Sequence, residues 1–334
     1  MMVSANVARR AFSREKIGWL KIAVLACAAV AACLGYMFVN SHFGNAKLFA
    51  YALKLRTPRL AAMVLTAYAI GAASMVFQSI INNTIVTPCL LGMNSLYTLV
   101  HTAIVFVAGT GSAFASSPNL AFALDLVVMS AASALIYGYF FGKTRGNVLY
   151  ILLIGTVLTS FFSSIQSTLT RVMDPNEYDA LLVTLVAGFD HVRSEIIALA
   201  AVLLFGIAFA LRRELSLLDV LTLGKDQAVN LGVDYEACVR KLLLGVALYI
   251  AVATALVGPI SFLGLIIANL SRRLLRTFRH SQLVAGSALF GMIALVGGQL
   301  LVEHVYDYAI PVSVFVTVSG GVYFLYLLLR GKRA

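Results

Sequence analysis

Ten apolar stretches follow one another along the chain, and short polar segments separate them. Within each stretch the apolar residues run together instead of alternating with polar ones. Most stretches approach the roughly 20 residues that an α-helix needs to cross a bilayer. The pattern therefore predicts an all-α polytopic membrane protein with about ten transmembrane helices. The expected spans are residues 20–39, 60–80, 92–109, 119–141, 148–168, 194–211, 241–257, 260–275, 283–303 and 311–329.

The composition supports this prediction. Hydrophobic residues make up 61% of the 334 residues and charged residues only 12%, whereas soluble domains carry about 25% charged residues. Because the connections between the spans are short, residues 1–334 are expected to form a single transmembrane domain with little room for a soluble catalytic domain.

The chain lacks familiar catalytic motifs such as HExxH, CxxC and GxSxG. Residues 138–144 come nearest to a phosphate-binding loop, but one residue too few separates their glycines and no strand precedes them. We therefore expect no enzymatic activity and no cofactor. Any ATP that drives transport would bind to a separate polypeptide.

Lys and Arg are distributed unequally between the two sets of connections. If both termini lie on one side of the membrane, 19 of the 25 Lys and Arg residues lie on that side. An excess of these residues marks the cytoplasmic face, so residues 1–19 are expected to be a cytoplasmic N-terminal tail and residues 212–240 a cytoplasmic loop. The net charge of +11 therefore indicates membrane topology and gives no support for nucleic-acid binding.

Residues 258–273 depart from the pattern of an ordinary span. Gly and Pro interrupt the start, Asn269 lies at membrane depth, and Arg272 and Arg273 close the segment. Such a span is short and distorted and is expected to pack against other helices, as in a membrane protein that moves a solute. The two arginines are expected at the cytoplasmic face.

The loop 212–240 carries signals for short helices. Gly224 and Gly232 each suit the left-handed residue that ends a helix, and Asp226 suits the cap at the start of the segment between them. Two short helices with a glycine joint are therefore expected, each too short to be stable alone in water. They would pack either on a cytoplasmic partner or on the lipid and the protein's own helix ends.

The longest connection on the other side covers residues 170–193. Its Asp174-Pro175 pair is a helix-start signal, and residues 178–188 are apolar but too short to cross the membrane. A short helix is expected at the outer mouth. It serves either as a gate or as an interfacial helix without a gating role.

Polar residues inside the expected spans are few and are therefore candidates for function. Asp125 is the one carboxylate that a proton- or sodium-coupled transporter would use, and its expected position close to the membrane surface argues against that mechanism. An ATP-independent secondary transporter or channel for a small solute is the alternative interpretation. Amides commonly serve helix packing. Those that are also candidates for lining a pathway are Gln78, Asn82, Asn83 and Asn269.

Four motifs follow one another along the chain. Residues 56–59 read Arg-Thr-Pro-Arg, residues 78–92 contain Gln, Asn-Asn-Thr and Thr-Pro-Cys-Leu-Leu-Gly, residues 223–233 contain Leu-Gly and Ala-Val-Asn-Leu-Gly-Val, and residues 258–266 read Gly-Pro-Ile-Ser-Phe-Leu-Gly-Leu-Ile. From about residue 55 to the C-terminus, the chain resembles the permease subunits of vitamin B12 and ferric-siderophore ABC importers, the FecCD-type permeases. The last two motifs are highly specific in combination.

Several positions depart from the pattern of that family. Residues 267–269 read Ile-Ala-Asn where the family commonly has Val-Pro-His. Residues 83–85 read Asn-Thr-Ile in place of Asn-Pro-Leu, and residues 297–299 read Gly-Gly-Gln where many members have an Ala-Asp pair. These variants resemble the branch in which two different permeases pair to import ferric siderophores, often catecholate ones. They favour a siderophore over vitamin B12 and a heterodimer over a homodimer.

The resemblance implies the type II ABC importer permease fold in the inner membrane of a bacterium, with both termini cytoplasmic. Two permeases would surround a pathway, two ATPase subunits would dock on the cytoplasmic side, and a substrate-binding protein would dock outside. Arg56 and Arg59 match outer arginines that pair with carboxylates on the binding protein, a role that suits the planar guanidinium; the alternative is anchoring to lipid headgroups. The residues expected to couple to the ATPases are Leu223, Gly224, Asp226, Ala228, Leu231, Gly232, Arg272 and Arg273.

Overall fold

The computed structural model describes residues 2–39, 46–112, 117–136, 139, 148–189, 192–307 and 310–331, and every regular element in these ranges is a helix. The segment 138–144, with its partial resemblance to a phosphate-binding loop, lies outside the described residues except for Tyr139. The helices are α1 (Met2–Phe38), α2 (Ala46–Ile81), η1 (Pro88–Leu91), α3 (Met93–Ala108), α5 (Pro118–Leu135), α7 (Val148–Val172), α8 (Pro175–Leu185), α9 (Ser194–Ala210), α10 (Arg212–Ser216), α11 (Leu218–Leu221), α12 (Lys225–Asn230), α13 (Tyr235–Val257), α14 (Leu263–Leu275), α15 (His280–His304) and α16 (Val312–Gly331).

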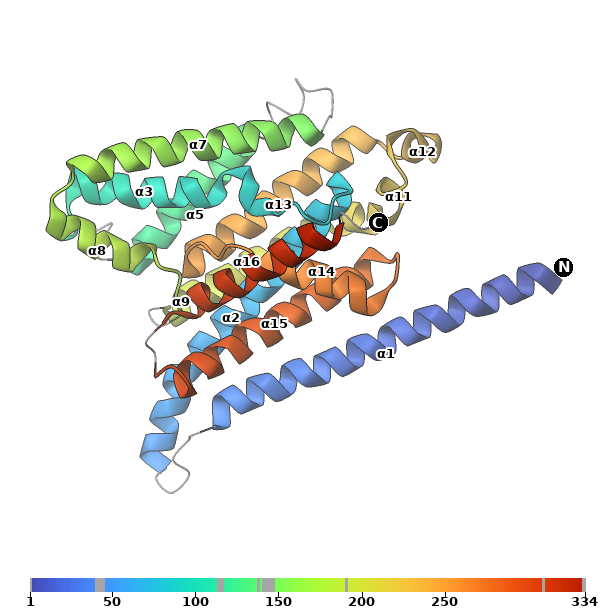
Figure 1. The fold of residues 1–334 in the computed structure, drawn as a ribbon, viewed down its shortest axis with the longest axis horizontal. Coiled ribbons are helices and arrows are strands. Elements are labelled where there is room, and N and C mark those ends of the chain that lie inside the picture. The colour runs from blue at the N-terminus through green and yellow to red at the C-terminus, as the bar shows by residue number, and fades with distance from the viewer. Residues whose placement is uncertain are drawn as a thin grey trace.

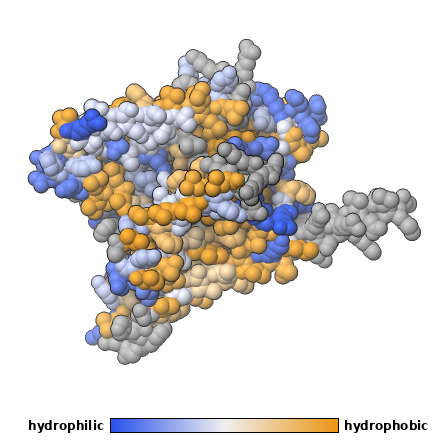
Figure 2. Space-filling view, in the orientation of Figure 1, coloured by the Kyte–Doolittle hydropathy of each residue, from blue (hydrophilic) through white to orange (hydrophobic). Residues whose placement is uncertain are grey.

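Each of the ten expected spans corresponds to a helix. In the described residues, six helices are long and apolar enough to cross a membrane, and α3, α9 and most of α16 form shorter apolar helices. The remaining span is α14, with 13 residues. The all-α polytopic architecture predicted from the sequence is therefore confirmed, and the apolar surface of the bundle is visible in Figure 2.

Two predicted span boundaries are wrong, and the expected tail has a regular structure. The second span does not start at residue 60, because α2 already begins at Ala46 and continues through Pro58. The eighth starts late: Phe262 has a φ of +61°, and the helix begins only at Leu263. The expected N-terminal tail, residues 1–19, is helical from Met2 and continuous with the first span. A proline inside a helix removes one backbone hydrogen bond without necessarily ending the helix.

Helices α2 and α13 form the centre of the bundle, with α15 packed along α2 (Figure 1). The approach of α15 to α2 is close because Gly71 has no side chain. A Cβ atom at that position would lie 2.9 Å from the backbone nitrogen of Ala288. The hydroxyl of Ser287 donates a hydrogen bond to the carbonyl of Gly71 over 3.1 Å, which ties the two helices together.

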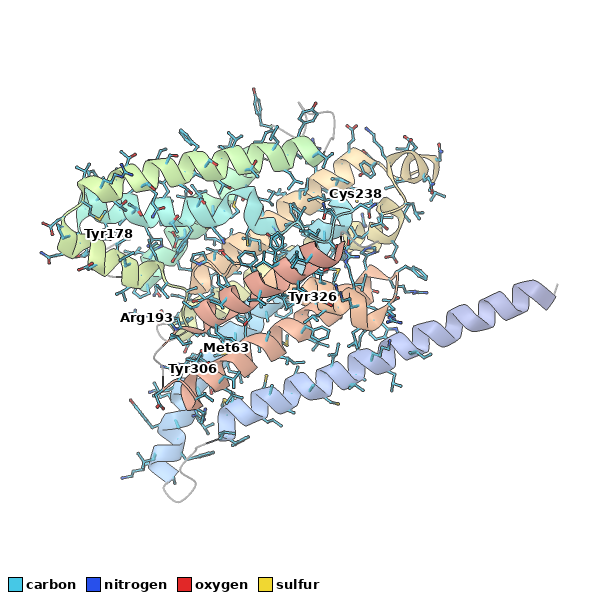
Figure 3. The ribbon with its side chains drawn as sticks, viewed as in Figure 1. Met63, Tyr178, Arg193, Cys238, Tyr306 and Tyr326 are labelled. Atoms are coloured by element: carbon cyan, nitrogen blue, oxygen red, sulfur yellow. The ribbon has the colours of Figure 1, made fainter. Side chains whose placement is uncertain are left out.

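The bundle has two distinct ends. We call the end with α10, α11 and α12 the α12 end, and the opposite end, with α8, the α8 end; the start of α1 and the end of α16 both lie toward the α12 end (Figure 1). Helix α8 begins where the Asp174-Pro175 signal predicts: Asp174 accepts a hydrogen bond from the backbone N–H of Asn176 over 2.9 Å. Figure 3 marks the two ends with Tyr178 on α8 and Cys238 near the start of α13.

Candidate coupling and pathway site

The loop between α9 and α13 contains three short helices where two were expected. Gly232 has a φ of +82°, and Val233 donates its backbone N–H to the carbonyl of Ala228 over 3.0 Å, so that α12 ends in the predicted left-handed turn. Gly224 has a φ of +105° and occupies the N-cap of α12. The cap predicted for Asp226 is wrong, since Asp226 lies inside the first turn of α12.

One side of these short helices faces the bundle. Leu218, Leu221 and Ala228 are buried, and α11 packs against α2 while α12 packs against α13. Packing on the protein's own helix ends, one of the two alternatives left open by the sequence, therefore accounts for this side. Ala228, a predicted coupling residue, points inward.

The other side of the same segment exposes apolar side chains. Leu223, Val229 and Leu231 are 54%, 53% and 63% exposed. Leu223 and Leu231 were predicted coupling residues, whereas Val229 was not named from the sequence. We call these three side chains the leucine–valine patch. Apolar groups gathered on a loop that carries many charges are typical of a binding surface for another protein.

Polar contacts hold the segment on the bundle. Asp219 accepts hydrogen bonds from the backbone N–H of His280, over 2.8 Å, and from its Nδ1 atom, over 2.5 Å. The Nζ atom of Lys241 lies 2.9 Å from a carboxylate oxygen of Glu214. This hydrogen bond is the main reason that the pKa of Glu214 is lowered. The contacts join α10 to the second turn of α13 and α11 to the start of α15, so a force on the segment would reach both spans.

A cavity of about 210 Å³ lies beneath the segment, between the ends of α2 and α14 and the start of α15. Arg272 donates a hydrogen bond to the hydroxyl of Ser79 over 2.7 Å, while its Nε atom has no partner. Both polar atoms of the Gln78 amide are likewise buried without a partner, and the side chain is 1% exposed. The lining residues include Gln78, Ser79, Asn82, Asn83, Thr222, Arg272 and His280.

The structure thus brings three of the four pathway candidates to the same cavity as Arg272. Asn82, with a φ of +54°, follows the last residue of α2. Asn269 lies apart from them: its amide donates hydrogen bonds to the carbonyls of Thr84, over 2.8 Å, and Leu265, over 2.9 Å. Asn269 therefore ties the segment after α2 to α14, which is a packing role.

Arg273 differs from its neighbour Arg272. Its guanidinium lies 5.8 Å from the centre of the Tyr323 ring, over α16, and it is absent from the lining of the cavity. Of the two arginines that close α14, Arg272 therefore makes a buried contact with α2 and Arg273 makes a cation–π contact with α16.

Arg56 and Arg59 lie on α2 toward the α8 end rather than in a loop. Arg56 donates hydrogen bonds from Nη1 to the carbonyls of Tyr36, over 2.8 Å, and Val39, over 2.7 Å. Its Nη2 atom is also 3.8 Å from a carboxylate oxygen of Glu303, and its side chain is only 16% exposed. Since unpaired carbonyls end every helix, Arg56 has a structural role at the end of α1.

A feature not recognised in the sequence is a row of hydroxyl groups on α7. Most of these hydroxyls bond to backbone carbonyls of the same helix, as Ser164 does to Ser160 over 2.8 Å. Their spacing of three or four residues was a signal in the sequence, because it places them on one helix face. We call this row the α7 hydroxyl stripe. Its exposed members are Thr156, Ser160, Ser164, Ser167 and Thr168.

Comparison with known proteins agrees with this architecture. Residues 21–330 match the FecCD transport family. The chain is 39% identical to the petrobactin import system permease protein YclO of Bacillus subtilis, over 94% of this chain and 98% of the relative. It is 29% identical to the petrobactin import system permease protein FatC of Bacillus anthracis, over 95% of this chain and 89% of the relative.

A solved structure has a similar fold. An ABC transporter assigned to the metal-chelate type, in an inward-facing conformation, matches with a TM-score of 0.79 and 22% identity, over 92% of this chain and 98% of that chain. The match with the family covers almost the whole chain and favours an ABC permease over a self-sufficient transporter or channel. This chain belongs to the FecCD transport family.

Proposed function

We propose that the chain is an inner-membrane permease subunit of an ABC importer and that its cargo is a ferric siderophore, with petrobactin as the first candidate. The supporting observation is the 39% identity to a petrobactin permease over almost the full length of both chains. The permease performs no bond chemistry and binds no cofactor of its own. ATP is hydrolysed on separate subunits.

The proposed cargo is tested by uptake in a strain that depends on this importer. Labelled iron supplied as its petrobactin chelate should accumulate in cells with the intact permease and not in the deletion strain. Iron supplied as the citrate chelate serves as the matched control. Equal accumulation from petrobactin in both strains would reject petrobactin as the cargo. If the intact permease increased accumulation only from the citrate chelate, ferric citrate would become the proposed cargo instead.

The α12 end is the proposed docking surface for the ATPases, with both termini on the same cytoplasmic side. Two observations support this. The leucine–valine patch is exposed on and beside α12, and the loop that carries it contacts α2, α13 and α15 through α11, α12 and α10. Basic residues also gather at this end, among them Arg212, Lys225 and Arg272, as expected for a cytoplasmic face.

The docking proposal is tested with Leu223→Asp combined with Leu231→Asp. These substitutions place charges on the exposed patch without changing the buried side of the segment, so ATPase co-purification should fall by at least about tenfold while the permease still inserts. Gln227→Asp, at an exposed polar position of α12, is the matched control and should retain the ATPases. Normal co-purification of the double variant would reject this surface.

Two substitutions in the coupling loop, at Gly224 and Ala228, test whether its shape is needed for transport. Proline cannot adopt the φ of +105° found at Gly224, and Ala228 is fully buried. Gly224→Pro and Ala228→Arg are therefore expected to abolish coupling by deforming the segment. Normal ATP-driven transport in both variants would contradict the assignment of residues 212–240 as the coupling loop.

The second permease is proposed to face α7. Helix α7 packs mainly on α3 and η1 and leaves the α7 hydroxyl stripe uncovered. Figure 2 shows a pale, weakly polar band in the region of α7 in Figure 1. Small hydroxyl-bearing residues allow close helix contact and supply hydrogen-bonding groups along a polar pathway. A heterodimer is proposed because of the departures from the family motifs.

The α8 end is the proposed docking side for the extracytoplasmic binding protein. Arg56 and Arg59 both lie on the part of α2 toward this end, and a planar guanidinium suits pairing with a carboxylate of the binding protein. Arg56→Glu with Arg59→Glu is expected to weaken docking. Because Arg56 also contacts the end of α1, the thermal stability of the double variant is measured beside its affinity for the binding protein. The affinity must fall by more than the loss of folded permease explains. Unchanged affinity at moderate salt would remove this proposal.

A further inference from the structure

A second and larger cavity, of about 600 Å³, lies within this chain toward the α8 end. Its walls come from α3, α5 and α8, the segment that follows α8, the start of α9, the end of α13 and the residue before α16. The volume falls in the range of about 300–1,000 Å³ that is typical of small-molecule sites. The proposed ATPase and pathway residues at the α12 end take no part in it.

A buried pair of titratable side chains faces this cavity. The Nε2 atom of His101 on α3 lies 2.9 Å from Oδ2 of Asp125 on α5, and the two residues are 7% and 2% exposed. The sequence suggested that Asp125 lies close to the membrane surface, and the structure adds that it is buried beside a cavity toward the α8 end. Its second carboxylate oxygen, Oδ1, has no hydrogen-bond partner. The ring of Tyr97 packs 4.4 Å from that of His101 and keeps the imidazole in place.

The rest of the cavity gives Oδ1 little compensation. His101 is the one basic residue among the described lining residues, and it already contacts the other oxygen of Asp125. Most of the remaining lining is apolar, as at Phe122 and Val186. A carboxylate oxygen in such surroundings is costly unless it meets a hydrogen-bond donor or a cation. The cavity therefore combines an apolar volume with a carboxyl group whose second oxygen is buried without a hydrogen-bond partner.

The wall of the cavity is held in place by backbone contacts. Gly188 donates its N–H to the carbonyl of Val257 over 3.0 Å, and Ser313 donates its hydroxyl to the carbonyl of Ala187 over 2.7 Å. At Gly258, a Cβ atom would lie 2.9 Å from the Cα atom of Ala187, so these segments approach closely. The cavity is thus bounded by tied segments and is preformed, as small-molecule sites usually are.

We propose that this cavity binds a small amphipathic amine. Its ammonium group would donate to Oδ1 of Asp125 after a small turn of the side chain brings this buried atom to the cavity surface, and its apolar body would fill the space between α5 and α8. The ammonium is favoured over a neutral donor because a charge-assisted hydrogen bond to a carboxylate is stronger than a neutral one. The site is independent of the proposed cargo and of ATPase docking, since it uses none of their residues.

The test measures saturable binding of radiolabelled phenethylamine to the full-length chain in phosphatidylglycerol nanodiscs, together with any partner that co-purifies. Asp125→Asn should weaken binding by at least about tenfold, because the charge-assisted hydrogen bond is lost. Asp179→Asn, which removes an exposed carboxylate of α8, is the matched control and should leave binding unchanged. Phenethyl alcohol should compete at least about tenfold less well than the unlabelled amine.

A second variant tests the cavity without altering the titratable pair. Ala121→Phe adds a ring to the lining and should block the amine while Asp125 is retained. The proposal is overturned by absence of saturable binding. It is also overturned if amine and alcohol bind equally and Asp125→Asn has no effect, because the cavity would then only accept apolar groups.

The ammonium could belong to a soluble amine or to the headgroup of a lipid. Nanodiscs that contain phosphatidylethanolamine separate these sources. Reduced phenethylamine binding in them would identify the lipid headgroup as the occupant in the membrane, and unchanged binding would identify a soluble amine. Both results require the same interaction with Asp125.

Discussion

Helices α2 and α7 are both long and apolar, but they occupy opposite environments within the subunit. In the most apolar 18-residue stretch of each helix, the mean hydropathy is 1.9 for α2 and 1.6 for α7. Yet 72% of the residues in the α2 stretch are buried, against only 11% in the α7 stretch. Helix α2 packs against α13, α14 and α15, whereas α7 packs mainly against α3 and η1. Similar hydropathy therefore does not reveal which spans form the core and which remain available to lipid or a partner.

The largest expected effect comes from a substitution in the core helix. Gly71→Leu would place a side chain against the backbone of α15, where even a Cβ atom is within 2.9 Å of Ala288. Because backbone cannot move aside easily, we expect a loss of at least about 3 kcal/mol of stability, and with it most of the folded protein. The yield of monodisperse protein after solubilisation and its thermal midpoint measure this effect.

Gly206→Leu on the peripheral helix α9 is the matched control. A Cβ atom at Gly206 meets nothing within 4 Å, so this variant should keep the yield and thermal midpoint of the natural chain. Equal losses in both variants would show that glycine itself, rather than the contact of α2 with α15, is required.

A smaller effect on folding but a clear effect on transport is expected at α7. Ser160→Leu with Ser164→Leu removes two hydroxyls from the α7 hydroxyl stripe, and both positions are exposed in this chain. Stability should change by less than about 0.5 kcal/mol, while ATP-driven transport in proteoliposomes should fall about tenfold, as for a loss of about 1.4 kcal/mol along the pathway.

Val157→Leu, at an exposed apolar position of the same helix, controls for this experiment. It should leave both stability and transport unchanged. Normal transport by the double serine variant would place the stripe against lipid and would remove the proposal that α7 faces the second permease.

The smallest expected effect concerns the contact that joins the peripheral α10 to the core helix α13. The hydrogen bond from Lys241 lowers the pKa of Glu214 below its ordinary value of 4.5. A lowered folded-state pKa gives stability that is present above the unfolded pKa and is lost as pH falls through the folded-state pKa. Because Lys241 is 61% exposed, the contribution should be below about 1 kcal/mol.

Thermal unfolding from neutral pH to well below pH 4.5 measures this contribution. Lys241→Met should lower stability at neutral pH, and the difference from the natural chain should shrink as Glu214 becomes protonated. A constant difference at all pH values would show that Lys241 acts through packing of its aliphatic stem alone.

Local signals in the sequence predicted several details correctly. The Asp174-Pro175 start of α8 and the left-handed Gly232 after α12 are set by residues close in the chain, so their structures follow from local chemistry. The early start of α2 was missed because the helix begins at Ala46 and continues through Pro58, ahead of the apolar run from which the span was predicted. The burial of Asp125 was missed because it depends on α3 and α8, which are distant in sequence.

The candidate functional residues likewise divide into those that a local motif identifies and those that only the fold brings together. Leu223 and Leu231 were identified from a motif, but only the fold shows that they are exposed while Ala228 points inward. Gln78 and Arg272 are 194 positions apart in the chain, a separation that no local pattern bridges, yet they line one cavity.

Runs of apolar residues and short motifs are local properties, so they are enough to place this chain in a bilayer, to give the order of its spans and to identify its family. Which faces are covered and which polar groups meet depends on how the folded helices pack. The physical reason is that lipid and protein interior are similarly apolar, so a residue facing either one carries the same hydropathy. Close helix contacts and unsatisfied polar atoms arise between segments that are distant in the sequence. They distinguish a residue that faces the protein interior from one that faces lipid.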